Sequence, residues 1–176
     1  YENLLCVTDA ASNIFPDLST KRDIVQNAID LHTGLGLGVP KVAILSAVEV
    51  INPKIPSTVD AASLCKMAER GQITGGILDG PLGMDNAIDP EAARIKNLSS
   101  PVAGQAQILV TPDLEAGNML AKNLLFMAQA DSAGIALGAK VPIVLTSWAD
   151  SVQARPASAA IGVLHARHLA QQNTAF

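Results

Sequence analysis

The sequence predicts an α/β fold in which a mostly parallel sheet is flanked by helices. Short apolar runs, such as residues 41–45 and 108–110, alternate with longer stretches whose apolar residues recur at helical spacing. This alternation is typical of strand–helix–strand units, which build parallel sheets. The 176 residues are 49% hydrophobic and only 16% charged. This composition fits strands that are covered on both faces, or a surface that is buried against another domain or subunit.

The predicted strands are short apolar runs, most of which end at small or polar residues. They cover residues 4–7, 41–45, 76–78, 108–110, 134–137 and 142–145. The last two are joined through residues 138–140, Gly-Ala-Lys. Each run is too short for a buried helix, so a strand is the better interpretation.

The predicted helices lie between these strands, at residues 19–31, 57–70, 89–97, 113–129 and 150–171. Residues 19–23 resemble a capping box, and Ser57 with Asp60 three residues later gives a second helix start. Residues 89–91, Asp-Pro-Glu, supply an N-cap, a proline at the first helical position and an acidic first turn.

Five predicted strand ends carry small or polar residues, namely Thr8-Asp9, Ser46, Asp79-Gly80-Pro81, Thr111-Pro112 and Thr146-Ser147. Because the carboxyl ends of parallel strands meet at one edge of a sheet, we expect these groups to share that edge. Hydroxyls, carboxylates and free backbone amides suit an anionic ligand that is held by directional hydrogen bonds.

Charge and cysteine content argue against several classes of protein. The net charge is −4 and the 12 basic residues are scattered, so we expect no nucleic acid and no membrane as partner. Cys6 and Cys65 lack metal-binding spacing and fit reduced thiols of a cytoplasmic protein. His165 and His168 lie near a predicted helix C-terminus, where basic residues are favourable, so we expect no metal site there.

Collinear blocks over nearly the whole chain match a known pattern, at residues 7–11, 23–28, 41–47, 60–62, 71–72, 79–82, 101–106, 115–118, 138–147 and 149–151. On these blocks the chain resembles the C-terminal half of the phosphate acetyl/butyryltransferases, especially their butyryltransferase-like branch. That branch also occurs fused behind an enoyl-CoA hydratase-like domain. The resemblance implies the isocitrate dehydrogenase-like, or phosphotransacetylase, architecture. Residues 1–150 would then form the α/β C-terminal domain, and residues 151–176 a closing helix that packs on an N-terminal domain.

The family interconverts an acyl-CoA and inorganic phosphate with an acyl phosphate and CoA. The resemblance therefore implies a phosphate acyltransferase whose partners are acyl-CoA, inorganic phosphate and acyl phosphate. CoA would be a substrate, with no tightly bound cofactor and no metal. We expect a cytoplasmic homodimer, and we expect this chain alone to be inactive because the N-terminal domain would supply the opposite wall of the cleft.

The resemblance also implies roles for individual residues. Ser147 would place its hydroxyl near the reacting carbonyl or thiol, and Asp150 would act as the base. The residues expected to bind substrate or CoA are Ser46, Asp79, Gly80, Pro81, Lys96, Asn118, Lys122 and Trp148. Among these, the two lysines would meet CoA phosphates, and Asn118 would orient an acyl or phosphate oxygen.

Most of these residues also have a purely structural interpretation. Ser147 or Asp150 would cap the final helix, and Asp79 would brace the turn that follows it. Lys96 and Lys122 would be solvated charges on helices. The sequence alone leaves both interpretations open.

One departure from the family pattern favours a different function. The family carries Ser-Arg-Ala-Asp-Ser where this chain has Ser147-Trp148-Ala149-Asp150-Ser151. An arginine offers a charged fork to an oxyanion, whereas Trp148 offers one neutral N–H. The alternative is a catalytically inactive, acyl-CoA-binding regulatory domain like those at the end of malic enzymes. A dehydrogenase domain of the same fold is disfavoured, because the glycines at 34, 36 and 38 follow a helix instead of a strand.

Overall fold

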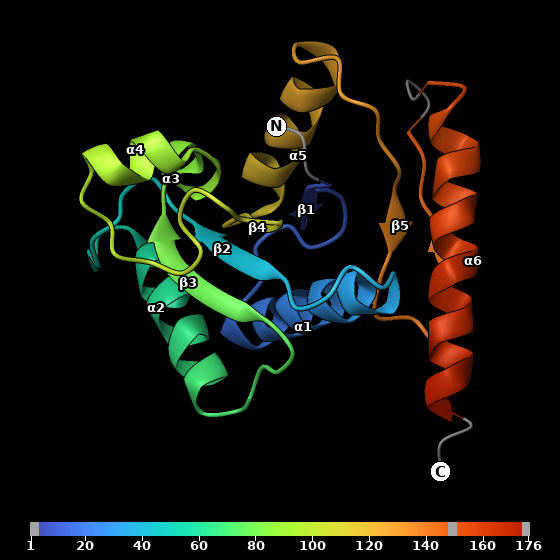
Figure 1. Cartoon of the computed structure of the whole chain (residues 1–176), viewed down its shortest axis with the longest axis horizontal. Helices are drawn as coiled ribbons and strands as arrows, with labels where there is room; N and C mark the ends of the chain where they lie inside the picture. Colours follow the sequence, from blue (N-terminus) through green and yellow to red (C-terminus); the bar gives the residue numbers. More distant parts are fainter. Residues whose placement is uncertain (1–3, 148–150, 174–176) are drawn as a thin grey trace.

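A four-stranded parallel sheet forms the centre of the computed structural model, which describes residues 4–147 and 151–173. Its strands are β1 (Cys6–Thr8), β2 (Lys41–Leu45), β3 (Ile77–Leu82) and β4 (Ile108–Val110). They are ordered β1-β4-β2-β3, and every neighbouring pair is parallel (Figure 1). The predicted fold class, an α/β chain with a mostly parallel sheet, is confirmed.

Helices cover both faces of this sheet. The helices of the described residues are α1 (Leu18–Gly34), α2 (Pro56–Glu69), α3 (Met84–Ile88), α4 (Pro90–Ile95), α5 (Leu114–Phe126) and α6 (Ala154–Asn173). Apolar residues of α1 and α2 pack on one face of the sheet, and those of α3 and α4 pack on the other. Of the longer helices, α6 is the one that contributes to neither of these two cores.

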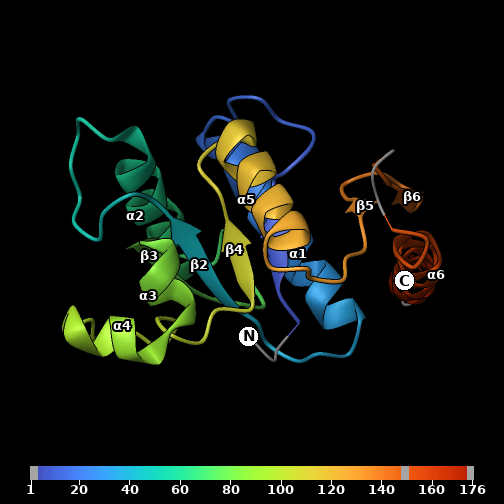
Figure 2. The ribbon, with the colours of Figure 1, turned by 90° about the horizontal axis from the view of Figure 1, so that it is seen from above.

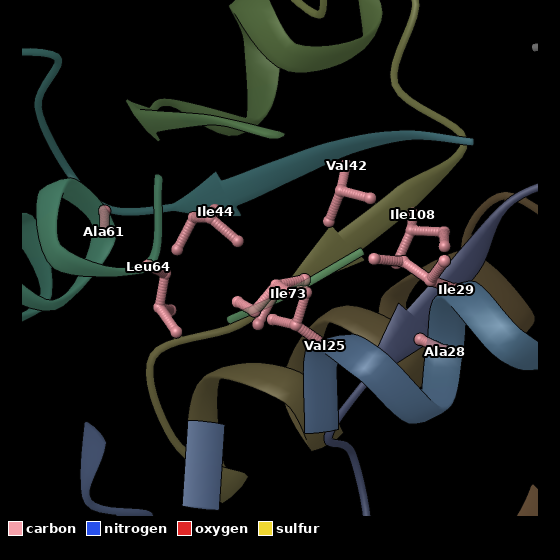
Figure 3. Packing of buried hydrophobic residues seen from close by; sticks show 10 residues of the cluster. Val25, Ala28, Ile29, Val42, Ile44, Ala61, Leu64, Ile73 and Ile108 are labelled. Atoms are coloured by element: carbon pink, nitrogen blue, oxygen red, sulfur yellow. The ribbon is translucent and has the colours of Figure 1, made fainter. Parts of the chain in front are cut away.

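Alternation along the strands divides the core into two layers. Val42 and Ile44 of β2 face α1 and α2, whereas Ala43 between them faces α3 and α4. Figure 3 shows Val42, Ile44 and Ile108 pointing toward side chains of α1 and α2. Because successive strand residues point to opposite faces, a strand covered on both sides must be apolar throughout. Burial on both faces therefore explains why the predicted strands are uninterrupted apolar runs.

The start of α1 differs from the prediction. Its N-cap is Asp17, whose carboxylate accepts hydrogen bonds from the Thr20 amide and the Ser19 hydroxyl, each at 2.8 Å. Residues 19–23 therefore do not form a capping box. Asp17, two positions before Ser19, is among the residue types preferred at an N-cap, and its carboxylate accepts both hydrogen bonds.

The start of α2 also differs, because its N-cap, Ile55, makes no side-chain hydrogen bond. Ser57 lies inside the first turn, and Asp60 is drawn to the buried Lys21 of α1, 2.7 Å away. A buried ammonium group requires a partner, so this tertiary ion pair decides the position of Asp60. The predicted cap Asp89 of α4 is confirmed. Asp113, the first residue of the predicted helix over residues 113–129, is the N-cap of α5.

Strand β3 is longer than predicted. Asp79, Gly80 and Pro81 lie within it and not beyond its end. The strand is at the edge of the sheet, where a proline without an amide hydrogen is tolerated. Gly80 fits there because a Cβ would lie 2.7 Å from the Ile44 carbonyl oxygen.

The last two strands form a separate antiparallel pair, β5 (Ile135–Ala136) with β6 (Ile143–Val144). The expectation that Thr146-Ser147 shares the edge of the main sheet is therefore wrong. The loop between the strands turns with Gly138 in the left-handed region (φ +86°), so β6 runs back beside β5 instead of joining the main sheet. Figures 1 and 2 show this hairpin beside α6 and away from the four-stranded sheet.

Helix α6 packs on the hairpin and on the end of α1. The Ser158 hydroxyl accepts from the Gly134 amide at 2.9 Å and donates to the Ala154 carbonyl at 2.6 Å, which ties helix and hairpin together. His165, only 7% exposed, lines a cavity of about 180 Å³ with Asn27 and Asp30 of α1. Among the described helices, none is both long and apolar enough to cross a membrane.

Acidification should loosen this contact between α1 and α6. Burial, reinforced by the nearby His168, lowers the pKa of His165 below its usual 6.5, although Asp30 opposes the shift. The unfolded chain then binds the proton more readily. The free energy of unfolding should fall as the pH drops from about 6.5, by at most about 1.4 kcal/mol per pH unit.

Thermal unfolding of the chain and of His165→Gln between about pH 8 and pH 5 measures this effect. We expect a smaller loss of Tm on acidification in the variant. The same loss in both proteins would show that His165 is not the group responsible.

Candidate functional site

The carboxyl edge of the parallel sheet carries three polar groups of residues. The Asp9 loop (residues 9–15) follows β1, a pair of serines lies between β2 and α2, and the Lys96 cluster (Glu49, Asp85, Asn86 and Lys96) follows β2 and β3. Ligands of open α/β sheets bind at this edge, where strand ends and helix N-termini meet.

The Asp9 carboxylate organises its own loop. It accepts hydrogen bonds from the backbone amides of Ala11, Ser12 and Asn13 and from the Asn13 side chain, at 2.7–3.0 Å. Burial by itself would raise the pKa of Asp9, but these hydrogen bonds outweigh it and the pKa is lowered. Asp9 is therefore ionised and committed to the loop, which makes it a poor proton acceptor for a substrate.

Thr111, directly after β4, and Asn118 of α5 hold the same loop from the other side. The Thr111 hydroxyl and the Asn118 side-chain amide each donate at 3.1 Å, to the carbonyls of Asp9 and Ala10. Gly117 lies so close that a Cβ would be 2.1 Å from the Asp9 carbonyl oxygen. The structure thus uses the Asn118 Nδ2 to anchor the loop, and its role toward a substrate oxygen stays a prediction.

Ser46 lies at the end of β2, with its hydroxyl 2.8 Å from that of Ser57 in the first turn of α2. Its backbone amide donates to the Leu82 carbonyl at 2.9 Å, which fixes it against β3. Since α2 begins without a side-chain cap, two hydroxyls and the positive end of a helix dipole lie together here. Such a group suits an anion.

The predicted Asp79-Gly80-Pro81 group lies within β3, where Asp79 is paired with Ala43 of β2. Asp79 accepts from the following Gly80 amide at 2.8 Å, which agrees with its structural interpretation. Burial, with a smaller effect of Asp79, raises the pKa of Cys65 to about 12, and burial raises that of Cys6 to about 11. Neither thiol is therefore ionised at neutral pH, and neither is an activated nucleophile.

Lys96 is neutralised by two carboxylates. Its Nζ lies 2.7 Å from Glu49 and 3.0 Å from Asp85. The hydrogen bonds from Lys96 lower the pKa of both acids, and the same contacts raise the pKa of Lys96. A lysine in two ion pairs is less available to a CoA phosphate than a solvated one.

The sequence reasoning did not select the partners of Lys96. Asn86 is fully buried and donates to Glu49 at 2.5 Å, and its Oδ1 has no hydrogen-bond partner among the described residues. Glu49 and the Asp85-Asn86 pair each follow a strand by a few residues, the same signal that selected Ser46. Their approach to one another depends on the folding of two separate loops.

The remaining predicted residues lie apart from this edge or outside the described part. Lys122 is exposed on α5, and Ser147 is exposed after β6, outside the main sheet. Trp148 and Asp150 lie outside the described residues. The structure therefore places Ser46 at the end of β2, Asp79–Pro81 within β3 and Lys96 against Glu49 and Asp85. Asn118 contacts the loop that follows β1. Within residues 4–147 and 151–173, no three His, Cys, Asp or Glu side chains form a group that could hold a metal ion.

The contact between Gly117 and the Asp9 loop can be tested by adding one methyl group. Alanine normally stabilises a helix by about 1 kcal/mol relative to glycine. Gly117→Ala should instead lower the free energy of unfolding by about 1–3 kcal/mol, because the methyl group overlaps the Asp9 carbonyl.

Urea unfolding measures this difference. Gly71→Ala is the control, because Gly71 has a φ of +74° but open space around it. Its cost should be about 1 kcal/mol, from backbone strain alone. A Gly117→Ala protein as stable as the native one would show that the loop is not held at this point.

Comparison with known proteins agrees with the resemblance. The family described as "Phosphate acetyl/butaryl transferase" matches residues 1–163. A phosphate acetyltransferase of Rhizobium meliloti is 70% identical over 166 residues, which are 94% of this chain and 52% of that protein. A phosphate butyryltransferase of Clostridium acetobutylicum is 46% identical over 164 residues, 93% of this chain and 54% of that protein.

A solved structure shows the same fold. The crystal structure of a branched-chain phosphotransacylase from Enterococcus faecalis V583 superposes with a TM-score of 0.81 at 39% identity, covering 89% of this chain and 58% of that one. The chain thus spans about half the length of the curated relatives named above. By the match over residues 1–163 and these identities, the chain belongs to the phosphate acetyl/butyryltransferase family.

Proposed function

We propose that this chain is the C-terminal half of a phosphate acyltransferase. The enzyme would interconvert an acyl-CoA and inorganic phosphate with an acyl phosphate and CoA. The observation that carries the proposal is the family match over residues 1–163, together with relatives that carry acetyltransferase and butyryltransferase names. Because the relatives named above act on different acyl groups by name, the proposal leaves the acyl chain unspecified.

The reaction requires three kinds of group. A CoA thiol or a phosphate oxygen attacks the acyl carbonyl, so the developing oxyanion needs hydrogen-bond donors and the thiol needs a base. We assign the donor role to the Ser147 hydroxyl, which is exposed, and the base to Asp150. The Ser46 and Ser57 hydroxyls at the start of α2 suit the phosphate.

Two exposed apolar surfaces support a cleft that a second domain completes. Val163 and Leu164 of α6 are 70% and 49% exposed, and residues 143–145 of the hairpin are also exposed. We propose that residues 1–150 form one wall of the cleft and that residues 151–176 pack on an N-terminal domain. The chain alone should then be inactive. A cytoplasmic homodimer is part of the same proposal, and the family and the apolar composition support the dimer. The acidic, unclustered charge supports the absence of nucleic acid and membrane as partners.

The alternative function, an inactive acyl-CoA-binding domain, rests on Trp148 in place of the family arginine. Relatives with transferase names do not support it. A fusion behind an enoyl-CoA hydratase-like domain stays a prediction.

Release of the CoA thiol from acetyl-CoA or butyryl-CoA in the presence of phosphate tests the proposal. The assay uses the protein together with its N-terminal half, because the cleft needs both. We expect the native protein to be active and Trp148→Arg to lower KM for phosphate, since a guanidinium binds an oxyanion through two hydrogen bonds. Ser147→Ala is the inactive control. No thiol release by either the native protein or Trp148→Arg, with CoA binding retained, would support the regulatory domain instead.

The two lysines expected to bind CoA should behave differently. Lys122→Gln should raise KM for acyl-CoA about tenfold, the effect of losing roughly 1.4 kcal/mol from one charged contact. Lys96→Gln should change KM little and lower Tm, because Glu49 and Asp85 lose their shared cation. Steady-state kinetics and thermal unfolding of both variants measure this. A larger rise of KM in Lys96→Gln than in Lys122→Gln would contradict the assignment.

A further inference from the structure

The Asp9 loop exposes large apolar side chains at the carboxyl edge of the sheet. Phe15 is 77% exposed and Ile14 is 62% exposed. Contact of an apolar ring with water is unfavourable in free energy. Exposed apolar groups near the edge of a sheet where ligands bind can therefore mark a binding site.

The loop that carries Phe15 is held in one conformation. Besides the hydrogen bonds to Asp9, the carbonyl of Ile14 accepts from the Leu114 amide at the start of α5, at 3.2 Å. Asn118 and Thr111 hold the residues before it. Since β1, β4 and α5 all fix the loop, the cost of ordering it is met by folding, and a ligand does not have to supply it.

Beside Phe15 lies an open hollow of about 360 Å³. Its apolar lining residues are Ile14, Phe15 and Pro16, and its polar ones include Asn13, Asp17 and Thr20. The volume is at the small end of the range for ligand pockets, which suits one part of a larger ligand. Among the described residues of this lining, Asp17 is the ionisable one, and its carboxylate already accepts a hydrogen bond as the N-cap of α1.

We propose that the Asp9 loop binds the adenine base of acyl-CoA, with the base stacked on Phe15; this rests on the proposed function. A flat base stacks on an exposed aromatic ring, and its exocyclic amino group suits a carboxylate or carboxamide acceptor such as Asp17 or Asn13. The ends of β1 and β2 are separated by β4, hence by roughly 10 Å. The extended diphosphate and pantetheine arm of CoA spans such a distance, from the Asp9 loop to Ser46.

Two thioesters separate binding of the base from the chemistry. The protein with its N-terminal half is assayed with acyl-CoA and with the acyl-pantetheine thioester, which lacks the adenosine. Phe15→Ala should raise KM for acyl-CoA about tenfold, the effect of losing one stacked base, and leave KM for acyl-pantetheine unchanged. Phe15→Trp should retain the native KM for acyl-CoA. Phe126→Ala is the matched control, an exposed phenylalanine (62%) at the end of α5.

The inference would be overturned if Phe15→Ala raised KM equally for both thioesters. It would also be overturned if the variant changed KM for neither of them. A lower Tm with equal effects would show that Phe15 packs against another part of the protein. Calorimetric CoA binding keeps this test separate from the proposed function. Loss of CoA affinity in Phe15→Ala, in a protein without acyl transfer, would refute the function and keep the adenine site.

Discussion

The burial of β4 on both faces and both edges is the constraint on which the rest of this structure depends. Ile108, Leu109 and Val110 are each at most 2% exposed, and β4 pairs with β1 on one side and β2 on the other. Strands buried in this way need a helical layer on each face. Helices α1 and α2 supply it on one face, and α3, α4 and Leu120 of α5 supply it on the other. The same pairing aligns the carboxyl ends of the strands and so creates the edge at which the polar groups gather.

At that edge, polar side chains are used first to hold loops. Asp9 is used by its own loop, Asn118 anchors that loop from α5, and Lys96 lies between two acids. Buried or half-buried polar groups need partners, and a loop without regular hydrogen bonds supplies them. A rigid edge can then offer the hydroxyls of Ser46 and Ser57, and the ring of Phe15, in fixed positions. Preorganisation of this kind favours binding because less order must be imposed by the ligand.

Some elements could be predicted because their causes are local. The apolar runs at residues 42–45 and 108–110 predicted β2 and β4. The N-cap Asp89 could be predicted because a short acidic side chain accepts hydrogen bonds from free helix amides. The predicted start of α2 was wrong for a non-local reason. Asp60 is paired with Lys21, 39 residues away, and so does not cap the helix. The length of β3 was missed because a Gly-Pro pair indicates a turn unless the strand is known to lie at a sheet edge.

The sequence by itself determined the fold class, the family and the approximate positions of the main-sheet strands, because apolar periodicity, turn chemistry and collinear motifs are properties of neighbouring residues. Only the tertiary structure decided which strand ends share an edge. It separated Ser147 from Ser46 by placing β6 in its own hairpin, and it joined Glu49, Asn86 and Lys96 from three segments. Strand order and the pairing of distant charges depend on how the layers pack, and this packing is set by contacts between residues far apart in the chain.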